Sequence, residues 1–245
     1  MIKIENVEVM GWKAAIRGMR NPMNSWDKSD STFMTLNYCD TLDEFHLIEL
    51  CGGNAPKLGL NDLDLMKRLR NAGTDHRKFM RMITVYVDIT APLYWWKEFD
   101  TYKVGTVANS CSTMHKIHAK EFTLEDFSCE HLGVLVPAEL NDGDEVYQNL
   151  WEESLKRTIT DLNIARGYYN DEKRDPKLKK EYWYQMIQLL PISYNQRRTV
   201  MLNYEVLANI YKSRKNHKLD EWHNLCDWIE TLPYSELITG EEDRK

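Results

Sequence analysis

The segment from Gln196 to Lys215 constrains the fold of this chain most, because its spacing predicts a helix that carries polar residues on an apolar face. Asn203 and Arg214 are eleven residues apart, close to three whole turns at ~3.6 residues per turn, so both face the same side. An amide and a guanidinium on such a face are costly unless they meet a polar partner. That partner is either the rest of the protein or a ligand. The apolar residues of the segment are Val200, Leu202, Val206, Leu207 and Ile210.

The bulk composition indicates a globular protein without a general affinity for polyanions. With 245 residues and 42% hydrophobic content, the chain can bury a sizeable core. A net charge of −6 argues against a general nucleic-acid or membrane-surface binder. The five cysteines are odd in number and show no CxxC spacing, which favours reduced thiols. Because no signal peptide or membrane-spanning run is visible, we expect a cytoplasmic protein.

The order of periodic segments predicts an α+β fold. Strand patterns at Ile2–Met10 and Phe79–Ile89 precede helical patterns at 145–169, 176–190 and 218–232. Runs of strands followed by runs of helices are typical of this class. No repeat or low-complexity linker interrupts the chain, so we predict one domain over residues 1–245, strand-rich over 1–140 and helical over 141–245.

A second polar segment runs from Tyr102 to Lys116. A helix end and the break at Gly105 lead into Asn109, followed by Ser and Thr residues. Backbone amides at such a turn, with Lys103 and His115 nearby, are suited to hold an anion such as a phosphate. The alternative is ordinary loop chemistry, for which Ser, Thr and Asn are common residues.

The spacing in this segment also allows two other kinds of site. Cys111, His115 and His118 are spaced four and three residues apart, as two zinc ligands on one helical face would be. No partner pair at ligand spacing follows, so the prediction is no metal. Cys111 beside His115 or His76 could be a nucleophile, but nothing marks the thiol as activated.

The succession of these parts resembles the flavin-dependent thymidylate synthase family over roughly residues 46–232. That family has a helix, a long strand, a second helix leading into an Arg-His-Arg…Ser-x-Asn-Glu-x-Ser-x-Arg motif, and later a Leu-Pro entry to a helix. That last helix carries an Asn, a second Asn six residues on and an Arg eleven residues on. The matching parts here are Leu65–Gly73, Phe79–Ile89, Tyr94–Lys103, Asn109–Ser112, Leu190-Pro191, and Asn203, Asn209 and Arg214.

The resemblance implies a fold with an antiparallel sheet, and a role for each matching residue. Asn203, Asn209 and Lys103 would contact FAD, and Arg214 would contact the pyrimidine of deoxyuridylate. Asn109 would lie with Ser112 at the phosphate and pyrimidine end. His115 and Arg197 would supply positive charge to the substrate from shifted positions.

The resemblance also implies a reaction and an assembly. The family methylates deoxyuridylate with methylenetetrahydrofolate while reduced flavin supplies hydride, and no side chain acts as a covalent nucleophile. The protein therefore orients its ligands around a cofactor that does the hard chemistry. The family builds each site at subunit contacts, so we expect a homo-oligomer, a tetramer by resemblance.

The chain departs from the family where positive charge matters most. Aligned through Asn109, the Arg-His-Arg positions read Tyr102, Lys103 and Val104, and the final Arg of the motif reads Met114. Arginine matches phosphate with two parallel hydrogen bonds, whereas lysine is a point charge. The alternative function is therefore a non-catalytic nucleotide-binding or assembly module that keeps the fold. A third possibility is a partner-binding protein whose Asn and Arg residues satisfy one another.

Overall fold

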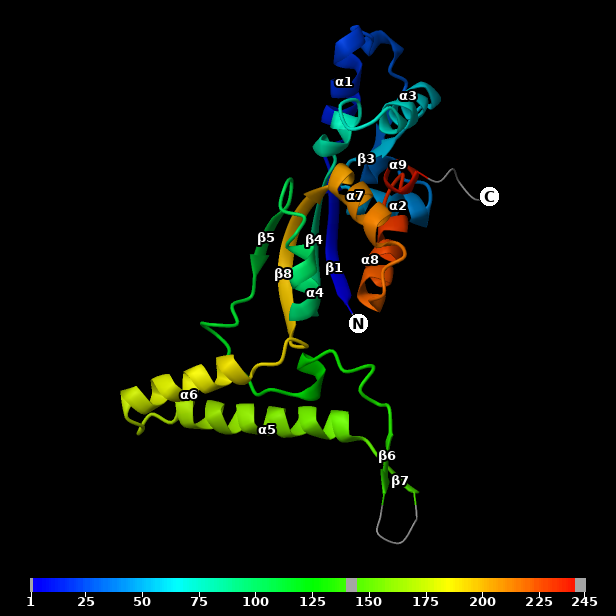
Figure 1. Cartoon of the computed structure of the whole chain (residues 1–245). Coiled ribbons are helices and arrows are strands. Elements are labelled where there is room, and N and C mark those ends of the chain that lie inside the picture. Colours follow the sequence, from blue (N-terminus) through cyan, green and yellow to red (C-terminus); the bar gives the residue numbers. More distant parts are fainter. Residues whose placement is uncertain (1, 140–144, 241–245) are drawn as a thin grey trace. The chain divides into compact units, whose positions relative to one another are not determined.

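The computed structural model describes residues 2–139 and 145–240, which gather into two compact units (Figure 1). The sheet unit comprises Ile2–Ile89, Phe99–Asn109 and residues 198–240. The helical-hairpin unit comprises Thr90–Glu98 and Ser110–Arg197. The chain passes between the units several times, and individual strands belong to both. The single domain expected from the sequence stays a prediction.

A four-stranded sheet has the order β1-β4-β8-β5. The strands β4 and β8 run antiparallel, since hydrogen bonds join opposite ends of their sequences. The Tyr204 amide donates to the Ile83 carbonyl (3.1 Å), and the Leu93 amide donates to the Tyr194 carbonyl (3.0 Å). The α+β class with an antiparallel sheet is confirmed. The four strands are β1 (Lys3–Met10), β4 (Thr84–Pro92), β8 (Asn195–Asn203) and β5 (Val107–Ser110).

The helix predicted to begin at Gln196 is wrong in its first part, which forms strand β8 instead. Side chains along β8 alternate between faces in the way that a strand requires. Gln196 and Val200 are buried, whereas Arg197 is exposed. The helix α7 (Tyr204–Arg214) starts only after Asn203. The two-residue period, together with pairing to β4 and β5, outweighs the helical spacing in this stretch.

Two other predicted boundaries near the sheet also need correction. The strand expected from Phe79 begins later, because Arg77–Met82 form a 3-10 helix and β4 starts at Thr84. The helix expected up to Lys103 is shorter, as α4 covers Leu93–Phe99.

The helices predicted in the second half of the chain are present with shifted ends. They are α5 (Leu150–Asn170), α6 (Pro176–Leu189) and α8 (Asp220–Glu230). The residues expected to start the first of them form β7 (Glu145–Gln148), which pairs antiparallel with β6 (Val136–Glu139).

The core of the sheet unit is built on alternate residues of β4. Val85, Val87 and Ile89 point to one face and are at most 1% exposed. The ring of Trp12 packs edge-on against those of Tyr204 and Tyr234, with centroids 5.4 Å apart in each pair. Such aromatic packing adds to the hydrophobic stabilisation. The remaining elements of the unit are α1 (Trp12–Arg20), β2 (Thr32–Met34), α2 (Leu42–Leu50), β3 (Ala55–Lys57), α3 (Leu60–Asn71) and α9 (Glu236–Thr239).

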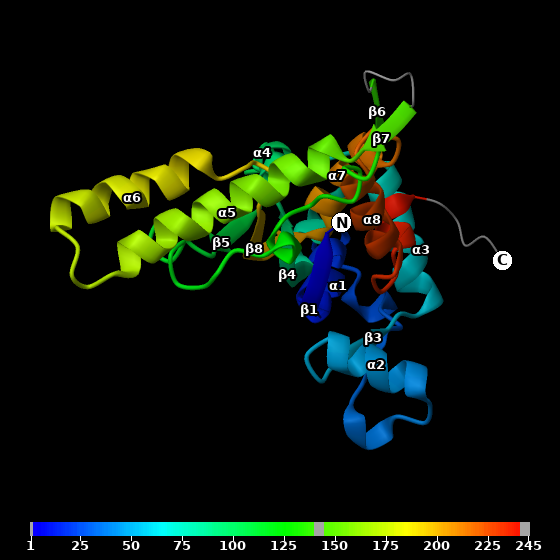
Figure 2. The same cartoon turned by 90° about the horizontal axis from the view of Figure 1, so that it is seen from below.

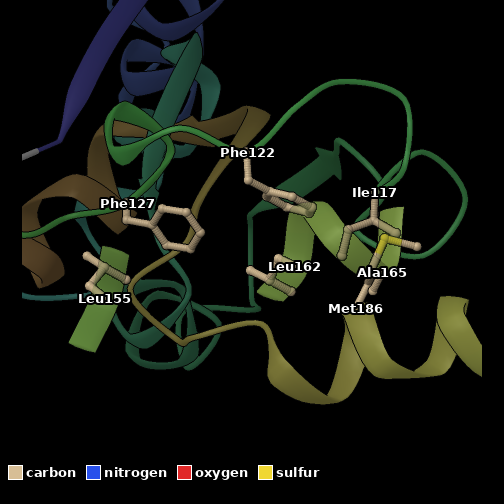
Figure 3. Close-up of a cluster of buried hydrophobic side chains, with 7 residues drawn as sticks. All are labelled: Ile117, Phe122, Phe127, Leu155, Leu162, Ala165 and Met186. Atoms are coloured by element: carbon tan, nitrogen blue, oxygen red, sulfur yellow. The ribbon is translucent and has the colours of Figure 1, made fainter. Parts of the chain in front are cut away.

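The helical-hairpin unit is organised by α5 and α6, which lie side by side in both views (Figure 2). Asp175 caps α6 by accepting a hydrogen bond from the Lys177 amide (2.7 Å), with Pro176 as the first helical residue. In the part of the chain that the structure describes, no helix has the length and apolar character needed to cross a bilayer. The core of this unit comprises Ile117, Phe122, Phe127, Leu155, Leu162, Ala165 and Met186 (Figure 3).

Candidate functional site around helix α7

Asn203 caps the N-terminal end of α7. Its buried side chain accepts a hydrogen bond from the Val206 amide (3.1 Å), as a helix N-cap does. Its Nδ2 donates to the Gly105 carbonyl at 3.5 Å. Gly105 has a φ of +79°, and a Cβ atom there would come within 3.0 Å of the Asn203 Nδ2. Glycine is therefore needed both for the backbone conformation and for the close approach.

Arg214 ends α7 between two aromatic rings. Its Nε donates a hydrogen bond to the Tyr102 hydroxyl (3.0 Å). The guanidinium carbon lies 4.5 Å from the centroid of the Trp222 ring, which is cation–π geometry. Tyr102 and Trp222 in turn meet edge to face at 6.1 Å. The guanidinium is therefore fixed by the protein itself.

Both ends of α7 thus meet one turn, the segment between α4 and β5. The Gly105 carbonyl accepts a hydrogen bond from the Asn203 amide, and the Tyr102 hydroxyl accepts one from the Arg214 guanidinium. The polar partner that the sequence required for these two residues is a part of the chain itself. The same turn carries Lys103, whose side chain is exposed.

A buried carboxylate lies on the first turn of α7. Glu205 is 7% exposed and accepts hydrogen bonds from Arg77 Nε (3.1 Å) and Arg81 Nη2 (3.3 Å), and also from Arg81 Nε. Desolvation raises the pKa of Glu205, but the hydrogen bonds and charges of Arg81 and Arg77 outweigh it, so the pKa lies below its ordinary value. The hydrogen bond to Glu205 raises the pKa of Arg81. Glu205 and Arg81 are therefore both charged at neutral pH.

This ion cluster reaches Asn209 through Arg77. While Arg77 Nε holds Glu205, its Nη2 donates to the Asn209 Oδ1 (3.0 Å). Asn209 is exposed, and its Nδ2 donates no hydrogen bond to any of the described residues. The two N–H donors of this exposed amide are therefore available to a ligand.

The other residues predicted to contact the substrate lie at and beyond β5. Asn109 is an exposed residue of β5 in the sheet unit. Ser112, His115 and Arg197 belong to the helical-hairpin unit. The Ser112 Oγ accepts hydrogen bonds from the amides of Met114 (3.1 Å) and His115 (2.9 Å).

A backbone bond connects this turn to β8. The Cys111 amide donates to the Arg197 carbonyl (2.9 Å), so Ser112 follows directly after the residue that pairs with Arg197. The exposed side chains of His115 and Arg197 stay predicted substrate contacts.

The sequence predictions did not include the ion cluster around Glu205. A signal was available, because Glu205 lies between Tyr204 and Val206 in a mostly apolar helix, and carboxylates are rarely buried unless paired. The identity of its partners was out of reach, since no spacing rule relates Arg77 and Arg81 to a helix so distant in sequence. Trp222 was missed for the same reason.

The possible zinc and nucleophile sites gain no support from the side-chain geometry. Within the described residues, no three His, Cys, Asp or Glu side chains are grouped to hold a metal ion. The ring of His118 packs on Tyr169, with centroids 4.5 Å apart. Burial, with the charges of Lys116 and Arg166, lowers the pKa of His118.

Comparison with solved structures places this geometry in a known fold. No protein-family model and no curated protein sequence matches the chain. The flavin-dependent thymidylate synthase ThyX from Helicobacter pylori, complexed with FAD and dUMP, matches over 98% of both chains, with a TM-score of 0.58 and 14% identity. The UMP/dUMP methylase PolB from Streptomyces cacaoi, bound with 5-Br dUMP, matches over 98% of this chain and 95% of that chain, with a TM-score of 0.56 and 13% identity.

The chain has the fold of the flavin-dependent thymidylate synthases. The fold expected from the spacing of Asn203, Asn209 and Arg214 is therefore confirmed. The thymidylate synthase fold is shared by proteins that methylate or bind uridine nucleotides. Activity has to be argued from this chain's own side chains, since a fold does not determine function.

Proposed function

We propose that this chain binds a flavin and a pyrimidine nucleotide, and that it methylates deoxyuridylate with methylenetetrahydrofolate and reduced flavin. The observation that supports this most is the exposed amide of Asn209, which the ion cluster around Glu205 orients on a thymidylate synthase fold. Preorganised donors of this kind favour ligand binding because their orientation is settled before the ligand arrives.

The residues of α7 fit a flavin in part. The Asn209 Nδ2 could donate to a carbonyl oxygen of the ring system, since its own oxygen is occupied by Arg77. Asn203 already caps α7 and contacts Gly105, so its contribution would be to fix the start of the helix. Lys103 is exposed and could attract a phosphate of the cofactor. The bound, reduced flavin would supply the hydride.

Arg214 is the proposed contact for the pyrimidine. Tyr102 and Trp222 hold its guanidinium in place, which reduces the entropy lost when a ligand binds. Asn109, Ser112, His115 and Arg197 are proposed for the phosphate end of the nucleotide. In this arrangement the side chains orient and bind, and none of them acts as a covalent nucleophile.

A second candidate is a nucleotide-binding or assembly module without catalysis. It is favoured by Tyr102, which stands where the family has the first arginine of its motif and which already serves to hold Arg214. Val104 adds no charge, so Lys103 remains from that triplet to attract an anion. We also propose a homo-oligomer, a tetramer by resemblance, which light scattering of the purified protein would measure.

Absorbance and calorimetry separate the two candidates. The enzyme is expected to be yellow, or to take up FAD in titration, with deoxyuridylate binding strengthened by flavin. A colourless protein that takes up no FAD would contradict the catalytic proposal. Nucleotide binding that does not depend on flavin would favour the module.

Asn209→Ala tests the observation on which the proposal rests. It should weaken FAD binding, while Lys212→Ala, an exposed residue of the same helix, should leave it unchanged. Equal FAD affinity in both variants would exclude Asn209 from the flavin site.

Arg214→Ala should weaken nucleotide affinity by roughly 1–3 kcal/mol, as removal of a charged hydrogen-bonding partner does. The measurement is calorimetric titration with deoxyuridylate. Tyr102→Phe is the control, because it removes the hydroxyl that Arg214 Nε contacts and leaves the guanidinium. Unchanged affinity with a lowered melting temperature in Arg214→Ala would show that Arg214 is structural.

A further inference from the structure

A cavity of about 250 Å³ lies in the sheet unit, between α1 and the segment that leads into β2. It lies apart in sequence from every residue assigned to flavin or nucleotide. Its lining includes Lys13, Arg17, Arg20, Trp26, Ser31 and Phe33. A volume of this size holds one ring with a small substituent, because sites for drug-sized ligands occupy about 300–1,000 Å³.

Three cations on one face of α1 line the cavity, and only one of them is neutralised. Lys13, Arg17 and Arg20 are spaced four and three residues apart, so they lie one above the other along the helix. Arg20 donates to Asp62 at 2.6 Å, and both groups are almost fully buried. Across the described ranges, no carboxylate forms an ion pair with Lys13 or Arg17. Like charges at this spacing repel each other, and an anion between them would relieve the repulsion.

The wall opposite α1 is preformed. Asp62 accepts hydrogen bonds from the hydroxyls of Ser29 (2.7 Å) and Ser31 (2.6 Å), and from the Ser31 amide (3.1 Å). The Ser31 hydroxyl also accepts a hydrogen bond from the Gly59 amide (3.1 Å). These bonds fix the segment next to the cavity, so a ligand would not have to order it.

An exposed aromatic ring completes the cavity. Trp26 is 50% exposed, and its indole Nε1 donates to the Asn21 Oδ1 at 2.9 Å, which holds the ring in one orientation. Phe33 is half-buried and lies 5.2 Å from the Lys13 Nζ. An oriented, exposed indole beside two cations can stack on a planar ring while the cations bind its charge.

We propose that this cavity is a second binding site, for a small aromatic ring that carries one anionic group, a carboxylate or a phosphate. Arg17 and Lys13 bind the anion and Trp26 stacks on the ring. The fork of Arg17 matches the oxygens of either group, and Lys13 adds a point charge.

Calorimetric titration of the full chain with benzoate and with phenyl phosphate tests the proposal and distinguishes the two anions. Acetate lacks the ring and benzamide lacks the charge, so each should bind about tenfold more weakly or not at all. Benzoate should bind saturably if the site takes a carboxylate, and phenyl phosphate should bind saturably if it takes a phosphate. Absence of saturable binding by both aromatic anions would overturn the proposal, as would acetate or benzamide binding as well as they do.

Matched variants locate the site. Arg17→Ala should lower the affinity about tenfold or more, as expected for a lost charged partner. Arg68→Ala removes the same charge from an exposed position of α3 and should leave the affinity unchanged. Trp26→Leu removes the stacking ring without altering charge, and it should also weaken binding of the aromatic anion. Equal affinity in Arg17→Ala, Trp26→Leu and the wild type would overturn the proposal, and none of these results depends on flavin or deoxyuridylate.

Discussion

Two carboxylates of the sheet unit, Asp62 and Glu205, are both buried and paired with arginines. They differ in how far those arginines are exposed to solvent. Asp62 and its partner Arg20 are 0% and 4% exposed, and serine hydroxyls and backbone amides fill the remaining positions around the carboxylate. Around Glu205, Arg77 is 18% exposed and Arg81 is 52% exposed. One cluster is closed on itself, and the other opens to solvent through its arginines.

The difference shows how the same pair of residue types can serve two purposes. The closed cluster holds neighbouring segments together, which here are α1, α3 and the segment before β2, and it thereby fixes one wall of the cavity beside α1. An open cluster can pass its orientation to an exposed group, and Arg77 does this for Asn209. Burial of the cations, rather than of the carboxylate, therefore distinguishes a cluster that fixes backbone segments from one that orients an exposed side chain.

The largest effect is expected at the closed cluster. Asp62→Asn leaves the buried Arg20 without a counter-charge, so the free energy of unfolding should fall by about 3–5 kcal/mol. Denaturant titration measures it. Asp64→Asn on the same helix is the control, because the Arg68–Asp64 pair is exposed and contributes at most about 1 kcal/mol. An equal loss of unfolding free energy in Asp62→Asn and Asp64→Asn would contradict the view that the Asp62 cluster is the buried, stabilising one.

A smaller effect is expected at the open cluster. Glu205→Gln should lower the free energy of unfolding by about 1–3 kcal/mol, because Arg77 and Arg81 lose a charged acceptor. Water can hydrate Arg81 in the variant, and this keeps the cost below that of Asp62→Asn. The same variant should weaken FAD binding through Asn209. A loss of stability as large as that of Asp62→Asn would mean that the open cluster is closed in solution.

The cap of α7 should matter less again. Asn203→Ala removes the hydrogen bond to the Val206 amide and should cost about 1 kcal/mol in thermal or denaturant unfolding. Asn209→Ala, at an exposed position, should change stability by less than about 0.5 kcal/mol. The opposite ranking of these two asparagines would show that the exposed one is structural.

The contribution of Glu205 should disappear in acid. Because the pKa of Glu205 is lowered in the folded protein, its contribution to stability is present above its unfolded pKa near 4.3 and is lost as pH falls through the folded value. The difference in unfolding free energy between wild type and Glu205→Gln should therefore shrink below about pH 4. A difference that stays constant down to pH 3 would show that the charge of Glu205 contributes nothing.

The sequence predicted the fold better than it predicted the contacts. Asn209 and Arg214 lie on α7 as predicted, whereas Asn203 is the last residue of β8 and caps that helix. The boundary with β8 was missed because the apolar residues of 196–203 are the short run 200–202, which fits a helix or a strand, and pairing with neighbouring strands decides between them.

The partners of the polar residues could not be predicted from local pattern. Arg214 meets Tyr102 and Glu205 meets Arg77 at sequence separations of 112 and 128 residues. Such contacts are set by how the elements pack. The sequence could indicate that these groups need partners, since buried charges are rarely unpaired, but not which ones.

The length of helix α7 fixes the distance between its two end residues. The eleventh and last residue of the helix is the arginine that contacts Tyr102, and the cap just before its first residue contacts Gly105, so both ends meet one short turn. One residue added within the helix would rotate everything after it by ~100° and carry Arg214 away from Tyr102 and Trp222. Helix length is thus a constraint of its own on this chain, separate from the identity of any side chain on it.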